Sequence, residues 1–214
     1  FEVFGLALEG INSEGLAVVH LADKDTEFHH ENLATHATAT GFNEFLPIQF
    51  LLDTCATASE ARDALQSMEH YHAAFATHLL VADQEGNSFV FEYTPDGTGK
   101  TFVRGSHTEP QVVTNFQLNR LANEELSSEL KSRSSENGFD RYAALKSRID
   151  QAGFPISEDE ARDLNASVYV HEDRREVLDR TIFHTVYDQA ARSVQVRLLP
   201  TGKGADNQFF RFSL

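Results

Sequence analysis

An amide side chain ends the apolar run "PQVVTN" at residues 110–115, where it could take part in catalysis. When a nucleophile attacks an amide, the carbonyl oxygen gains negative charge, which a neutral NH₂ donor can stabilise without protonating it. The side chain of Asn115 offers such a donor. Asn also caps helices, and the sequence from Phe116 onwards is helix-like, so both roles are open for Asn115.

Cys55 is the single cysteine of the 214-residue chain, and with a histidine as base it could act as a nucleophile. It follows the apolar sequence "PIQFLLDT" at residues 47–54, where a free cysteine is usually a small buried hydrophobe. Nothing nearby in the sequence would lower the pKa of its thiol. We therefore expect Cys55 to be inert, with thiol hydrolysis as the alternative.

The sequence "DGTGKT" at residues 96–101 ends like a phosphate-binding loop. The full motif requires a Gly where Thr94 stands, and a helix where a strand is predicted. We interpret this sequence as a hairpin turn.

The histidines of "FHHENLATH" (residues 28–36) and "EHYH" (residues 69–72) do not show the i, i+4 helical spacing of many zinc sites. We expect solvent-exposed loop histidines here, with zinc as the alternative. Neither a metal nor another cofactor is predicted.

The bulk composition narrows the class of protein. A net charge of −15 and a pI near 5.0 argue against a nucleic-acid surface. No apolar run approaches the roughly 20 residues of a membrane span. The single cysteine excludes an intrachain disulfide and fits a reducing compartment, which favours the cytoplasm. The length suits one domain, residues 1–214.

Alternating and amphipathic segments predict the elements that position these residues. Strands at 2–9 and 15–22 form a hairpin about a turn in which Asn12 is structural, and a long loop covers 23–43. Two helices follow, and the second opens with a capping box, Thr57 with Glu60.

An antiparallel meander is predicted from residue 78, continued by the strand "QVVTN" at 111–115, and residues 118–166 are helical in composition. Gly153 closes one of these helices, and Ser157 with Glu160 caps the next. Strands return at 181–200 and 207–214. This order predicts an α+β domain of stacked antiparallel sheets with helices outside.

Four blocks of sequence, in this order, resemble a known family. They are "GINSEGLAVVH" (10–20), "LLDTCATASEARDAL" (51–65), "HLLVADQEGNSFVFEY" (78–93) and "VVTNFQL" (112–118). They are similar to the linear-amide hydrolases with an N-terminal Cys nucleophile: bile salt hydrolases, penicillin V acylases and the acyl-coenzyme A:6-aminopenicillanate acyltransferases. The acyltransferase branch is nearer, and residues 118–166 match less well.

The resemblance implies the four-layer αββα sandwich of N-terminal nucleophile hydrolases. In that family the first residue of the mature chain is the nucleophile, and its own α-amino group accepts the proton. An Asn at the end of the matching strand helps to form the oxyanion hole, which assigns that role to Asn115. Arg180 could orient a substrate carboxylate or acyl group through its bidentate guanidinium, and a surface ion pair is equally open.

This chain departs from the family at Phe1, where no Cys, Ser or Thr stands. We therefore expect the nucleophile and the first strands to lie in an upstream segment of the same protein, whose loss would expose a sheet edge. The expected function is hydrolysis or acyl transfer at a linear, non-peptide amide of a small molecule. A non-catalytic ligand-binding member of the fold is the alternative, and a homo-oligomer is possible.

Overall fold

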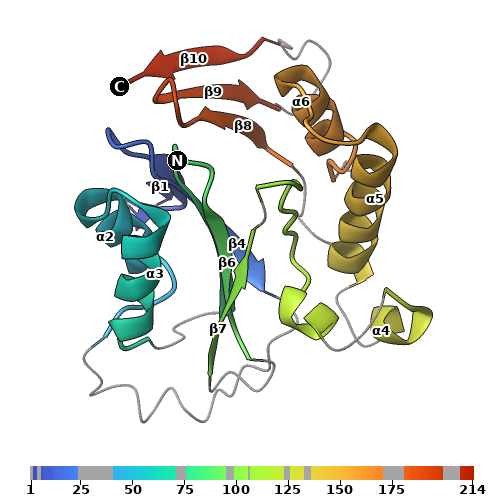
Figure 1. Cartoon of the computed structure of the whole chain (residues 1–214), viewed down its shortest axis with the longest axis horizontal. Coiled ribbons are helices and arrows are strands. Elements are labelled where there is room, and N and C mark those ends of the chain that lie inside the picture. Colours follow the sequence, from blue (N-terminus) through green and yellow to red (C-terminus); the bar gives the residue numbers. More distant parts are fainter. Residues whose placement is uncertain are drawn as a thin grey trace.

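A five-stranded antiparallel sheet forms the centre of the molecule (Figure 1). The computed structural model describes residues 2–3, 6–23, 41–70, 76–94, 99–105, 107–122, 126–132, 136–170, 181–199 and 208–214. The central strands, in spatial order, are β3 (Glu9–Ile11), β4 (Ala17–Asp23), β5 (Ala76–Ala82), β6 (Ser88–Tyr93) and β7 (Lys100–Arg104). Each strand pairs with the next along the chain, which confirms the predicted hairpin and meander.

The turn between β3 and β4 is held by the side chain of Asn12, as its predicted structural role requires. Its Oδ1 accepts hydrogen bonds from the backbone N–H groups of Glu14 (3.1 Å) and Leu16 (3.0 Å). Its Nδ2 donates to the carbonyl oxygens of Leu52 (3.0 Å) and Cys55 (2.7 Å). These bonds join the hairpin to the end of the following helix.

Two helices, α2 (Leu46–Thr54) and α3 (Ala58–Ser67), cover one face of the central sheet (Figure 1). The capping box of α3 is confirmed: the Thr57 side chain accepts from the N–H of Glu60 at 3.2 Å, and the Glu60 carboxylate accepts from the N–H of Thr57 at 3.3 Å. The apolar positions of both helices meet alternate residues of the strands. The resulting core includes Leu16, Val18, Ile48, Leu51, Leu65, Leu79, Val81, Phe89 and Phe91.

Further helices and a second sheet lie away from α2 and α3 (Figure 1). The hydroxyl of Tyr187, in the second sheet, donates to the carboxylate of Glu9 in β3 at 3.0 Å. The order of helices, sheet, sheet and helices confirms the predicted α+β sandwich of antiparallel sheets. The helices are η1 (Leu118–Ala122), α4 (Ser128–Ser132), α5 (Glu136–Ala152) and α6 (Glu158–Ala166), and the second sheet has the order β10 (Phe210–Ser213), β9 (Ser193–Leu198), β8 (Phe183–Asp188).

Local signals for these outer elements also hold. Gly153 follows α5 with a φ of +79°, and Ser157 with Glu160 forms the capping box of α6. A short hairpin of β1 (Glu2–Val3) and β2 (Leu6–Ala7) precedes β3. All four residues of β10 are exposed at the edge of the second sheet.

The strand predicted at residues 111–115 is wrong. Residues 110–114 run without a β-ladder, and Asn115 lies in a bend. Side-chain bonds hold this segment instead: Gln111 Nε2 donates to the carbonyl of Val103 at 2.8 Å, and the Thr114 hydroxyl donates to the carbonyl of Gly138 at 2.7 Å. An apolar strand-like composition therefore produced an extended segment that packs without pairing.

Two predictions fall partly or wholly outside the described residues: most of the loop at 23–43, and the centre of the turn at 95–98. Asp23 itself ends β4. Among the helices of the described ranges, none combines the length and the apolar character of a membrane span.

Candidate active site at Asn115

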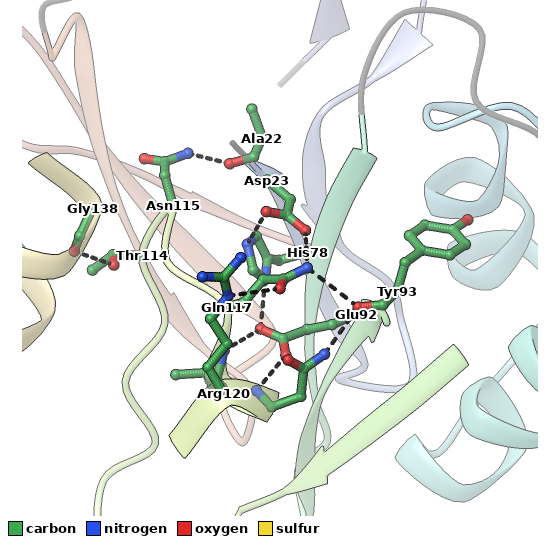
Figure 2. A network of polar contacts seen from close by, with 12 residues as sticks. Ala22, Asp23, His78, Glu92, Tyr93, Thr114, Asn115, Gln117, Arg120 and Gly138 are labelled. Atoms are coloured by element: carbon green, nitrogen blue, oxygen red, sulfur yellow. Dashed lines mark hydrogen bonds and ion pairs between the residues drawn. The ribbon is translucent and has the colours of Figure 1, made fainter. Parts of the chain in front are cut away.

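Asn115 lies between the end of β4 and the first turns of α5, and two contacts orient its side chain. Its Nδ2 donates to the carbonyl oxygen of Ala22, and its Oδ1 accepts from the guanidinium of Arg141 (Figure 2 shows the contact with Ala22). A guanidinium only donates and a carbonyl only accepts, so a flipped amide would lose both bonds. One N–H of the Asn115 amide remains without a hydrogen-bond partner among the described residues.

The backbone of Asn115 is in close contact with α5. A Cβ added at Gly138 would lie 2.8 Å from the carbonyl carbon and oxygen of Asn115 and 3.1 Å from the nitrogen of Phe116. The hydrogen bond from the Thr114 hydroxyl to the Gly138 carbonyl stabilises the same contact (Figure 2). Gly138 thus lets the helix approach the segment, and a side chain there would displace Asn115.

The helix-cap hypothesis for Asn115 is wrong. The first N–H groups of η1, those of Leu118 and Asn119, donate instead to the carboxylate of Glu92 at 2.7 Å and 2.9 Å. The side chain of Asn115 faces Ala22 and Arg141, where it caps no helix. The cap of η1 therefore comes from β6, and the amide of Asn115 is left for another role.

Four buried polar side chains lie beside this segment and are called here the buried polar cluster: Asp23, His78, Glu92 and Gln117 (Figure 2). His78 and Glu92 have no exposed surface. Nδ1 of His78 lies 2.8 Å from Oε1 of Glu92, and its Nε2 lies 3.6 Å from Oδ1 of Asp23. Nε2 of Gln117 donates to Oδ2 of Asp23 at 2.9 Å. The cluster links three adjacent strands to the residues after Asn115.

Two of the predicted alternatives can be judged from the structure. In the part of the chain that it describes, no group of three or more His, Cys, Asp and Glu side chains could hold a metal ion. The prediction that His70 is a solvent-exposed loop residue is wrong. Its ring stacks on Phe91 at 5.4 Å, and its Nδ1 lies 2.9 Å from the Tyr93 hydroxyl. Residues 28–36, His72 and Arg180 lie outside the described residues.

Lys100 belongs to the sequence "DGTGKT", which resembles a phosphate-binding loop, and it begins a strand as predicted. Its Nζ donates to the carbonyl oxygens of Leu65 (3.0 Å), Gln66 (3.3 Å) and Met68 at the end of α3. The lysine therefore satisfies the last carbonyl groups of a helix.

Cys55 is buried at the end of α2, which confirms its predicted place in the core. Burial raises the pKa of its thiol, and the Thr54 hydroxyl lies 3.7 Å from Sγ. A higher pKa reduces the fraction of thiolate, the form that attacks electrophiles.

We expect native Cys55 to react with a thiol reagent roughly 10²-fold more slowly than in denaturant, because it must wait for local opening. Stopped-flow labelling with and without denaturant measures the two rates. Complete labelling within seconds, with an unchanged circular-dichroism spectrum, would contradict this expectation.

The antiparallel sheets and outer helices have the arrangement of the class that the sequence resembles, the N-terminal nucleophile hydrolases. Residues 2–201 match the model of the acyl-coenzyme A:6-aminopenicillanic acid acyl-transferase family. The chain belongs to this family. No curated protein matches its sequence significantly.

Solved structures show the same fold. Penicillin V acylase from Agrobacterium tumefaciens superimposes with a TM-score of 0.65 at 19% identity, covering 98% of this chain and 66% of that one. Two variants of the conjugated bile acid hydrolase from Clostridium perfringens also match. One has a TM-score of 0.64 at 12% identity (100% and 75% covered), and the other has 0.63 at 13% (99% and 75%). The chain spans only part of each relative, and the likeness establishes the fold.

Proposed function

We propose that the full-length protein is a hydrolase or acyltransferase of linear, non-peptide amide bonds in small molecules. The reaction passes through an acyl-enzyme on an N-terminal cysteine outside these 214 residues. The observation that carries this proposal is the amide of Asn115, in a chain of this family: Ala22 and Arg141 orient it, and one of its N–H groups has no partner in the part of the chain that the structure describes.

The proposed chemistry assigns one step to this chain. The thiolate attacks the amide carbon, the C=O π pair moves to oxygen, and the free N–H of Asn115 donates to the oxyanion. Collapse of this intermediate breaks the C–N bond, and the amine leaves with the proton held by the α-amino group of the nucleophile. Water or a second amine then cleaves the thioester, which gives hydrolysis or transfer. One such donor contributes about 10²–10³ in rate.

The substrate is proposed by class. The solved relatives are named for penicillin V and conjugated bile acids, both amides of small molecules, and the family is named for transfer of an acyl group. Arg180 is proposed to orient a carboxylate or acyl group of the substrate, as a planar bidentate donor can.

The direct test is to incubate the full-length protein with penicillin V and with a taurine-conjugated bile acid. We expect amine release, together with a mass increase equal to the acyl group on the N-terminal peptide. A tight complex without amine release would indicate a non-catalytic binding protein. An acyl adduct on Cys55 would instead support the thiol hydrolase.

A further inference from the structure

We propose that Glu92 is a positioning residue for Asn115, and that the buried polar cluster fixes both sides of the Asn115–Ala22 contact. The inference rests on the proposed function for its catalytic meaning, and it deepens that function by adding residues that act through Asn115. Its structural part can be tested without any substrate.

Glu92 holds the chain that follows Asn115. Its fully buried carboxylate accepts from the N–H of Leu118 at 2.7 Å and from the N–H of Asn119 at 2.9 Å. Hydrogen bonds to an ionised acceptor are shorter and stronger than neutral ones. Only two residues, Phe116 and Gln117, separate Asn115 from the first of these anchored amides.

Asp23 helps to fix the position of Ala22, the hydrogen-bond partner of Asn115. It follows Ala22, whose carbonyl receives the Asn115 amide, and it accepts from Gln117 Nε2 at 2.9 Å. Two alternate residues of the segment, Asn115 and Gln117, therefore bind two successive residues of β4. A shift of the segment along the strand would break both contacts together.

His78 joins the two anchors. It lies on β5, between β4 and β6, with Nδ1 2.8 Å from Glu92 and Nε2 3.6 Å from Asp23. Nδ1 is hydrogen-bonded to Glu92, whereas the Nε2–Asp23 contact is longer than a hydrogen bond, so the two carboxylates flank the same ring and a displacement of either one changes its surroundings. The buried polar cluster therefore connects the two anchors beside residues 115–119.

Stability alone does not account for charges at this place. The neighbouring strand residues Leu79 and Phe91, on the opposite face of the same sheet, are apolar and almost completely buried. Well-packed apolar residues are often at least as stabilising as buried ion pairs. Directional bonds, however, select one position of the segment, and an oxyanion donor must be held to within about 0.5 Å. Precise placement of Asn115 explains the cluster better than stability does.

The test is Glu92→Gln in the full-length enzyme, which keeps the shape but turns one acceptor into a donor that faces a backbone N–H. We expect kcat to fall about 10-fold with KM nearly unchanged, since the oxyanion contact exists only in the transition state. In the Asn115→Ala background, the same substitution should change kcat by less than about twofold, because the two residues act through one contact.

Asp83→Asn is the matched control. Asp83 is also a buried carboxylate of this sheet region, and it accepts from the N–H groups of Ala58 and Glu85 at 3.0 Å. It follows β5 at the end opposite the cluster. Asp83→Asn should weaken the fold but leave kcat within about twofold of the wild type.

Hydrogen exchange gives a readout that needs no activity. The amides of Leu118 and Asn119 should exchange at least about tenfold faster in Glu92→Gln than in Asp83→Asn. Equal exchange in the two variants would overturn the proposal, as would equal kcat losses from Glu92→Gln with and without Asn115. If Asn115→Ala removes activity and Glu92→Gln does not, the positioning role fails and the proposed function stands. Faster exchange without any amide turnover supports the anchoring role and ends the proposed function.

Discussion

In the full-length protein, Asn115→Ala is expected to lower kcat on an amide substrate by about 10²-fold or more while the protein stays folded. The lost N–H would stabilise the oxyanion in the transition state and has no hydrogen-bond partner among the described residues. KM should change little, because the contact is weak in the ground state. Steady-state kinetics and the melting temperature of the same preparation measure the two effects separately.

Asn115→Asp is the more informative variant, because it keeps the oxygen acceptor of the side chain and removes its N–H donors. A carboxylate would keep the acceptor that Arg141 binds, so the fold should survive, but it would lose both N–H donors and place negative charge beside the oxyanion. We expect at least as large a loss of kcat as with alanine. Full activity of Asn115→Asp would end the oxyanion proposal.

Asn119→Ala is the matched control for both variants. Asn119 lies in the same segment, and its Nδ2 also donates to a backbone carbonyl, that of Tyr93, at 2.9 Å. Its removal should lower stability by about 1 kcal/mol and leave kcat within roughly threefold.

The parts of the fold that depend on near neighbours in sequence were predictable. Thr57 and Glu60 are three residues apart, and both bonds of their capping box are present. The β3–β4 hairpin and the β5–β7 meander pair across short turns, so alternation and turn residues were enough to predict them. The pairing of β4 with β5, which closes the sheet across two helices, was not predicted. The same reasoning wrongly predicted a strand at residues 111–115, because composition does not say whether an extended segment finds a ladder partner.

The surroundings of Asn115 were not predictable, since they come from distant parts of the chain. Ala22 is 93 residues away and Arg141 is 26, and the close approach of Gly138 depends on the docking of α5. A weak signal for the buried polar cluster did exist: Asp23, His78 and Glu92 are titratable residues in largely apolar strands. Only the strand order brings them together.

His78→Leu is expected to lower the free energy of unfolding by about 3–5 kcal/mol, a large share of the roughly 5–15 kcal/mol typical of a domain. The ring lies between Glu92 and Asp23 with none of its surface exposed. Leucine would fill much of the volume but lose the hydrogen bond to Glu92 and the 3.6 Å contact with Asp23. Asp23 would keep its bond from Gln117, and Glu92 would keep those from Leu118 and Asn119, but both buried acids would lose the imidazole between them. Equilibrium denaturation in urea at pH 7 measures the loss.

Two further variants separate this electrostatic cost from the loss of a buried ring. His70→Leu makes the same change at another packed histidine, which contacts Phe91, the Tyr93 hydroxyl and the Leu65 carbonyl, and it should cost only about 1 kcal/mol. Adding Asp23→Asn to His78→Leu removes one of the two facing charges. That second substitution should therefore cost less in the His78→Leu background than it does alone. Equal costs in both backgrounds, or a similar loss from His70→Leu, would show that His78 stabilises the fold by packing and that the carboxylates do not depend on it.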